Sequence, residues 1–142
     1  LRQGGDVVIA AIGHTVLPAL KAAEELAPLG IDASVVNARF VKPLDKNLFR
    51  DLLTRVPRLI TVEDHVVTGG FGSGLIEFLA DEGFTGIEVK RLGVPDRFIP
   101  HGTQDELRKM CGFDKDAIAQ ATLQLVRRGK KRSREGWERG SA

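Results

Sequence analysis

The chain has 142 residues, with 21 Lys and Arg against 19 Asp and Glu, and a single cysteine. This length suits one domain with its own core, one cysteine excludes an intrachain disulfide, and no apolar run approaches the roughly 20 residues of a membrane helix. Because seven of the basic residues lie after residue 126, the body is slightly acidic, so we expect neither a nucleic-acid partner nor a membrane partner.

Strand and helix patterns alternate along the chain. Short apolar runs predict buried strands, and apolar residues at helical spacing lie between them. The predicted strands are 7–12, 33–38, 59–62 and 87–92. The predicted helices run from Thr15 to Gly30, from Asp45 to Pro57, from the glycine cluster at 69–74 to Ala80, from the capping box at 103–106 to Gly112, and onward from Asp114. This alternation predicts an α/β fold, a three-layer α/β/α domain around a mostly parallel sheet, over residues 1–127.

The last segment, residues 128–142, differs from the body in composition. It is basic, and Trp137 is its one large apolar residue. We expect this segment to be a disordered tail, because it offers almost nothing to a core. The alternative is a segment that binds an anionic surface with Trp137 as an aromatic anchor.

The turns between the predicted elements carry few signs of chemistry. The first strand ends in Gly13-His14-Thr15, which lacks the G-x-G-x-x-G pattern of a dinucleotide site and so disfavours a Rossmann oxidoreductase. The glycine cluster at 69–74 has no Gly-Lys-Ser/Thr, so it is not a P-loop. Its glycines either let an anion approach a helix N-terminus or let the helix pack closely, and the second interpretation is favoured.

Polar side chains follow the third and fourth predicted strands, where α/β folds present functional groups. Glu63 and His65 could form an acid–base pair, but no nucleophile accompanies them, so solvated or interface polar residues are the favoured interpretation. The proline-containing loop 94–102 could dock on a partner or simply connect two elements. If any positions face a cleft between domains, we expect them to be Glu63, His65, Gly69, Gly70, Asp96 and His101.

Three segments together resemble a known enzyme family. Residues 35–45 (VVNARFVKPLD) and 59–74 (LITVEDHVVTGGFGSG) resemble two units of transketolase C-terminal domains, shared in looser form with the β-subunits of 2-oxo-acid dehydrogenases. Residues 93–102 (GVPDRFIPHG) resemble the corresponding loop of 1-deoxy-D-xylulose-5-phosphate synthases. The resemblance covers about residues 4–126, with Asp64 where the family commonly has Glu.

The resemblance implies the third domain of a homodimeric transferase of isoprenoid biosynthesis. Such an enzyme condenses pyruvate with glyceraldehyde 3-phosphate, releases carbon dioxide and uses thiamine diphosphate with Mg²⁺. In the family the first two domains hold these cofactors. We therefore expect this chain to bind neither cofactor, to contain no catalytic or metal-binding residue, and to be inactive alone. The implied partners are the enzyme's own first two domains and a second subunit, and the implied location is cytoplasmic.

The family fold has a mixed sheet of about five strands with one antiparallel strand. Since four strands are visible in the sequence, we expect residues 1–4 to be the stub of the fifth. The chain also lacks an initiator Met, which fits a fragment of a longer protein. Two alternatives stay open: the equivalent domain of a 2-oxo-acid dehydrogenase β-subunit, and a free-standing anion-binding module that uses residues 69–74.

Overall fold

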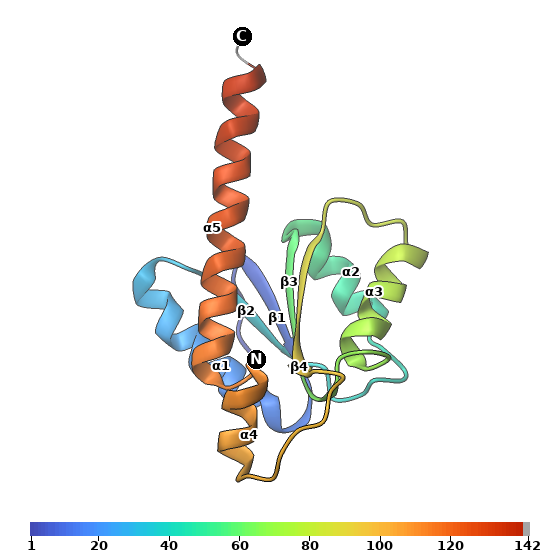
Figure 1. Ribbon diagram of the computed structural model, residues 1–142. Helices are drawn as coiled ribbons and strands as arrows, with labels where there is room; N and C mark the ends of the chain where they lie inside the picture. Colours follow the sequence, from blue (N-terminus) through green and yellow to red (C-terminus); the bar gives the residue numbers. More distant parts are fainter. Residues whose placement is uncertain (141–142) are drawn as a thin grey trace.

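Four parallel strands form the middle layer of the computed structural model, which describes residues 1–140 (Figure 1). They are β1 (Val7–Ala11), β2 (Ala33–Asn37), β3 (Arg58–Val66) and β4 (Glu88–Val94), in the spatial order β2-β1-β3-β4. All three pairings are parallel. The α/β fold with a mostly parallel sheet is therefore confirmed, with four strands in place of about five.

At the edge of the described sheet, Arg2 pairs antiparallel with Val35 of β2. Its N–H donates to the Val35 carbonyl at 3.3 Å, and its carbonyl accepts from the Val35 N–H at 2.9 Å. The Gly4 N–H then donates to Ser34 Oγ at 2.8 Å. Residues 1–4 thus lie along the outer edge of β2, where we expected the stub of a fifth strand.

Helices cover both faces of the sheet (Figure 1). On one face lie α1 (Val16–Leu26) and α5 (Lys115–Gly140), with α4 (Gln104–Cys111) beside them; on the other lie α2 (Lys46–Arg55) and α3 (Phe71–Asp81). Short 3-10 turns, η1 (Gly13–Thr15) and η2 (Ala27–Leu29), flank α1. The three-layer arrangement matches the prediction.

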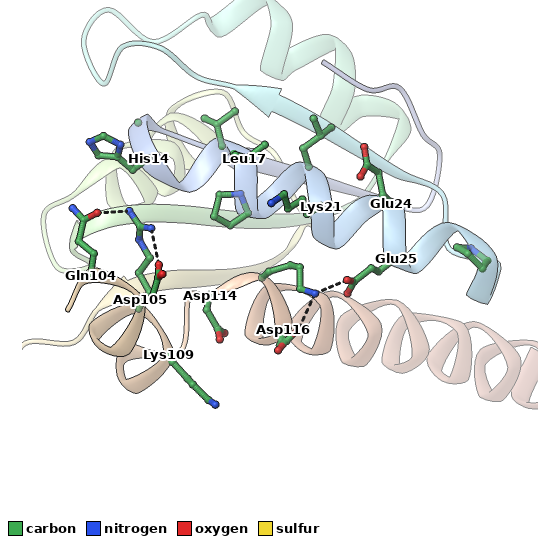
Figure 2. Close-up of a pocket in the computed structure, with 17 residues that line it drawn as sticks. His14, Leu17, Lys21, Glu24, Glu25, Gln104, Asp105, Lys109, Asp114 and Asp116 are labelled. Carbon is green, nitrogen blue, oxygen red and sulfur yellow. Dashed lines mark hydrogen bonds and ion pairs between the residues drawn. The ribbon is translucent and has the colours of Figure 1, made fainter. Parts of the chain in front are cut away.

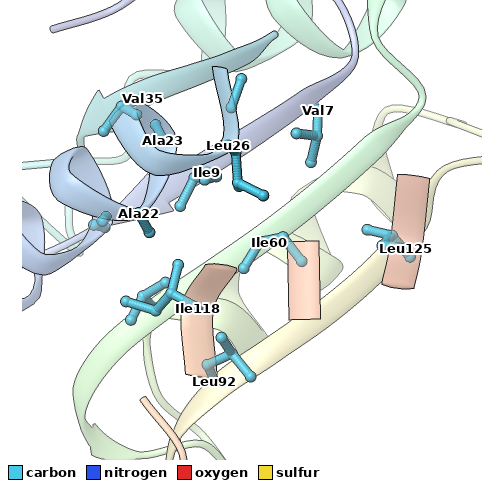
Figure 3. Packing of buried hydrophobic residues seen from close by; sticks show 14 of the residues in the cluster. Val7, Ile9, Ala22, Ala23, Leu26, Val35, Ile60, Leu92, Ile118 and Leu125 are labelled. Atoms are coloured by element: carbon cyan, nitrogen blue, oxygen red, sulfur yellow. The ribbon is translucent and has the colours of Figure 1, made fainter. Parts of the chain in front are cut away.

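The alternation of side chains along β1 explains its continuous apolar sequence. Val7 and Ile9 pack against α1 and α5 (Figure 3), whereas Val8 and Ala10 pack against α2 and α3. Every residue of β1 is fully buried. A strand with helices on both faces has no solvent side, so the sequence pattern loses its polar positions.

Three predicted helix starts are confirmed by their caps, whereas Thr15, at the start of α1, makes no side-chain cap bond. Asp45 Oδ1 accepts from the Leu48 N–H at 3.0 Å, and Asp114 Oδ1 accepts from the Ala117 N–H at 2.9 Å. Thr103 and Glu106 form the reciprocal capping box that the sequence predicts. These caps satisfy N–H groups that have no partner within their own helix.

The segment that we expected to be a disordered tail is helical as far as Gly140. Helix α5 continues through it and projects beyond the sheet (Figure 1). Gly129 packs against the Arg58 side chain, and Arg132 Nη1 lies 3.8 Å from Glu88 Oε2. Low apolar content argues against a core but not against helix, since Arg, Lys and Glu are good helix formers and an existing helix needs no new nucleus. Residues 141–142 and the Trp137 side chain lie outside the described part, so the anchor hypothesis is untested.

None of the helices described in residues 1–140 is both long and apolar enough to cross a lipid bilayer.

The connections place a topological switch point between β1 and β3. These strands are neighbours, yet β1 leads into α1 on one face and β3 leads into α3 on the other. The two connections therefore diverge at the carboxyl ends of the strands. In open α/β sheets such a divergence opens a crevice, which is where ligands and partners are most often met.

Candidate functional site

A cavity of about 430 Å³ lies at this switch point, and we call it the switch-point crevice. The ends of three strands and the segments that follow them supply its walls. They are Ile12, Gly13 and His14 after β1, Val41 after β2, Glu63, Asp64 and His65 at the end of β3, and Gly69, Gly70 and Phe71 at the start of α3. The crevice therefore brings together four of the six residues that we expected to face a cleft.

Glu63 has a structural task in this crevice. Its side chain is buried, and its two carboxylate oxygens accept from the Phe71 N–H at 2.7 Å and the Gly72 N–H at 3.0 Å. The carboxylate thus satisfies two free amides of α3 and places negative charge at the positive end of its dipole. Glu63 is therefore not a solvated residue, and its hydrogen-bond partners belong to the same domain. Its place at an interface stays a prediction.

The glycine cluster serves this close contact. A Cβ atom on Gly70 would overlap Glu63 Oε2 and lie 2.6 Å from the Val66 carbonyl oxygen, and one on Gly72 would lie 2.5 Å from Thr61 Oγ1. Close packing is therefore the correct interpretation of Gly70 and Gly72, whereas Gly69, with a φ of 73°, serves the tight turn. An external anion would need the amides that Glu63 already occupies, so the geometry argues against an anion-binding module.

A second network, which sequence reasoning missed, holds the turn from β3 to α3. Ser73 Oγ accepts from the Gly69 N–H at 3.0 Å and donates to the Val67 carbonyl at 2.9 Å. Arg91 Nη1 donates to the same carbonyl at 3.0 Å and to Ser73 Oγ at 2.9 Å. Arg91, inside the fourth predicted strand, was the sequence signal for this network. A charged residue is rarely buried unless it has partners, so its presence in a strand indicates a polar contact.

The exposed polar side chains of the crevice are His14, Asp64 and His65. Asp64 Oδ2 lies 3.8 Å from Arg108 Nη2, which links the end of β3 to α4. The lining contains no Ser, Cys, Thr or Lys, so it offers imidazoles and carboxylates without a hydroxyl, thiol or amine nucleophile. Such a wall can pack against another surface or help to enclose a space, but it is not a complete catalytic set.

The other two expected residues lie outside the crevice. Asp96 and His101 are exposed on the loop between β4 and α4, and neither lines the cavity. This loop leaves the carboxyl end of β4, so it shares the edge of the sheet on which the crevice opens. All six predicted positions therefore lie at the carboxyl edge of the sheet, whereas four of them line the crevice.

A larger cavity of about 1410 Å³ lies between α1, α4 and the start of α5 (Figure 2). Charged side chains on its walls pair with one another. Lys115 Nζ lies 2.5 Å from Glu25 Oε1 and 3.3 Å from Asp116 Oδ1, and these carboxylates, Glu25 foremost, raise the pKa of Lys115. This trough runs along the outer side of α1 and reaches one strand end, at Gly13 and His14, which it shares with the switch-point crevice. The crevice is lined from three strand ends, so we regard it as the better candidate site.

Comparison with known proteins identifies the family. The sequence pattern described as "Transketolase, C-terminal domain" matches residues 1–118. The chain belongs to this family.

Curated relatives of this transketolase C-terminal domain are much longer than the chain. It is 55% identical over 122 residues to 1-deoxy-D-xylulose-5-phosphate synthase 1 of Geobacter sulfurreducens, covering 86% of this chain and 19% of that protein. It is 52% identical over 130 residues to the 1-deoxy-D-xylulose-5-phosphate synthase of Aquifex aeolicus, covering 92% of this chain and 20% of that protein. The chain thus spans about a fifth of the length of these relatives.

Solved structures agree with the fold. A split-gene transketolase, described as an inactive beta4 tetramer, superposes with a TM-score of 0.81 at 33% identity, covering 88% of this chain and 40% of that one. A Pichia stipitis transketolase superposes with a TM-score of 0.63 at 23% identity, over 92% of this chain and 18% of that one. The second likeness supports the fold alone.

The core of this transketolase C-terminal domain extends past the matched residues. Leu125 and Val126 of α5 are buried against the sheet although the family match ends at residue 118. Thr122 is also fully buried, and its hydroxyl donates to the Ile118 carbonyl at 2.7 Å. The structural domain therefore includes about two further turns of α5.

Proposed function

We propose that this chain is the third domain of a thiamine-diphosphate-dependent 1-deoxy-D-xylulose-5-phosphate synthase. The observation that carries the proposal is the identity of 49–55% to three proteins of that name over 86–92% of the chain. In this proposal the longer protein condenses pyruvate with glyceraldehyde 3-phosphate, releases carbon dioxide and serves isoprenoid biosynthesis. Its other domains and a second subunit are the partners of this domain, in the cytoplasm.

The described residues of this chain do not fit thiamine diphosphate or Mg²⁺. Within residues 1–140 no group of three or more His, Cys, Asp or Glu side chains could hold a metal ion. The glycine-rich start of α3, which would suit a diphosphate, is filled by the Glu63 carboxylate. We therefore assign both cofactors to the rest of the longer protein and route no chemical step through this domain.

The role of this domain, in the same proposal, is to support and enclose the site of the longer protein. Glu63 fixes the start of α3, so Gly70 is closely packed in the wall that also contains Gly69 and His65. Asp96 and His101 lie at the same carboxyl edge. A wall whose supporting contacts are satisfied internally keeps its shape when it meets a neighbour, which favours precise packing and exclusion of water.

The test compares the 142-residue chain with the longer protein that contains it. With pyruvate, glyceraldehyde 3-phosphate, thiamine diphosphate and Mg²⁺, we expect 1-deoxy-D-xylulose 5-phosphate and carbon dioxide from the longer protein and no product from the chain alone. The longer protein without thiamine diphosphate is the control. Product from the chain alone would refute the proposal. A longer protein that instead transfers acyl groups from 2-oxo acids to an acyltransferase partner would favour the dehydrogenase alternative.

A further inference from the structure

The exposed phenylalanines of the chain gather at one edge of the sheet. Of seven phenylalanines, two have exposed side chains: Phe40 is 62% exposed and Phe98 is 90% exposed. Phe40 follows β2 and Phe98 follows β4, so both stand at the carboxyl edge. Val41, beside Phe40, is also exposed and lines the switch-point crevice. Single exposed apolar residues are ordinary, but large aromatic residues on one edge are typical of a contact surface.

The two phenylalanines stand on either side of the switch-point crevice. β2 and β4 are the outer strands of the sheet, and three strand spacings separate them, or about 14 Å. Between them the exposed imidazoles of His14 and His65 border the crevice. We call Phe40, Val41, Phe98, His14 and His65 the carboxyl-edge surface. Large side chains that become buried in a protein interface commonly supply much of its binding energy.

The loop that carries Phe98 is stiffened in its exposed position. Pro95 and Pro100 flank it and fix two backbone dihedral angles, and the Arg97 N–H donates to the Pro95 carbonyl at 2.8 Å. A side chain held outward by a restrained loop loses little conformational entropy when a partner covers it. The loop therefore presents Phe98 in a form ready for contact.

The course of the first residues shows from which side a longer chain reaches this domain. Arg2 pairs antiparallel with Val35, and Gly4 lies against Asp32 and Ala33 at the beginning of β2. The chain therefore runs from the carboxyl end of β2 toward its amino end. In a longer protein, the residues before Leu1 approach from the carboxyl edge, the same edge that exposes Phe40 and Phe98.

We propose that the carboxyl-edge surface is the docking face for the domain that immediately precedes this one in the longer protein. Phe40 and Phe98 are its anchors, and docking closes the switch-point crevice between them. The inference rests on the proposed function for the existence of that preceding domain, since the chain spans about a fifth of its relatives. It adds which face of this domain is buried and which side chains hold it.

Hydrogen exchange measured by mass spectrometry tests the docking face. We expect amides of residues 38–45 and 94–103 to exchange at least about tenfold more slowly in the longer protein than in the 142-residue chain. Residues 83–86, at the opposite edge, are the internal control and should exchange alike in both. Equal exchange of the two edge loops in both proteins would overturn the proposal. Protection that disappears on dilution to monomer would assign the face to a second subunit and would also overturn it.

Matched variants of the longer protein separate anchoring from general destabilisation. Phe98→Asp should abolish the protection of residues 94–103 and speed proteolytic release of this domain about tenfold. Leu29→Asp changes a side chain that is 65% exposed at the far end of α1 and should do neither. Equal behaviour of the two variants would refute the anchor role. Synthase activity measured on the same samples separates a failure of the docking proposal from a failure of the proposed function. Protected loops in a protein without synthase activity would support docking and contradict the proposed function. Unprotected loops in an active protein would refute docking and leave the proposed function in place.

Discussion

At the scale of single residues, Glu63 and Gly70 depend on one another. The carboxylate reaches the α3 amides because residue 70 has no side chain in its way. Gly70 has a negative φ of −87°, so an alanine there would meet no backbone strain, and any cost would be steric. A substitution at Gly70 therefore measures how much the close contact with Glu63 contributes to stability.

Gly70→Ala should lower the free energy of unfolding by about 2–3 kcal/mol, because the new methyl group displaces Glu63 and overlaps the Val66 carbonyl. Urea unfolding of the chain measures the change. The matched control is Gly74→Ala in the same helix, where a Cβ meets nothing within 4 Å and helix propensity predicts a gain of up to about 1 kcal/mol. A loss at Gly70 no larger than the change at Gly74 would show that the cap is dispensable.

At the scale of elements, the capping box of α4 makes the stability depend on pH. The backbone N–H and the hydroxyl of Thr103 both donate to the Glu106 carboxylate. These bonds, the N–H bond more than the hydroxyl bond, hold the pKa of Glu106 below its ordinary range. A depressed pKa means that the folded state favours the charged form. The resulting stabilisation is present above the unfolded-state pKa and is lost as the pH falls through the folded-state pKa.

Glu106→Gln should therefore be less stable than the wild type near neutral pH, and the difference should shrink on acidification from about pH 7 to about pH 3. Thermal unfolding across this range measures it. Thr103→Ser keeps a hydroxyl and a backbone N–H at the cap, so it should follow the wild-type profile. A wild-type-to-Gln difference that is constant with pH would exclude the charged capping box as its cause.

The elements also show what the sequence could predict. Caps such as Asp45 and Thr103 were predictable because donor and acceptor lie three residues apart in a fixed helical geometry. The role of Glu63 was not, since its contact with Phe71 depends on how β3 and α3 meet in three dimensions. The switch-point crevice likewise needed the strand order, because alternating strands and helices are compatible with several orders of the same strands.

At the scale of the whole molecule, α5 joins the domain core to a projecting basic helix. Leu125 and Val126 seal the face of the sheet that α1 and α5 cover, whereas residues after Gly129 extend past it (Figure 1). The composition of residues 128–142 predicts a tail because it registers the lack of apolar residues, whereas it does not register the helix that precedes them. Burial in α5 therefore continues past the end of the family match.

Chains ended at two points in α5 test where the core ends. Ending the chain after Thr122 removes Leu125 and Val126, whose burial contributes about 1.5–3 kcal/mol each. Since small domains are stable by about 5–15 kcal/mol in total, this chain should be largely unfolded or should unfold at much lower urea. Ending the chain after Ser133 keeps both residues and the contact of Gly129 with Arg58, so its urea midpoint should match that of the full chain. If the shorter chain were as stable as the longer one, the last turns of α5 would not belong to the core; if both were destabilised, the projecting helix would contribute to folding as well.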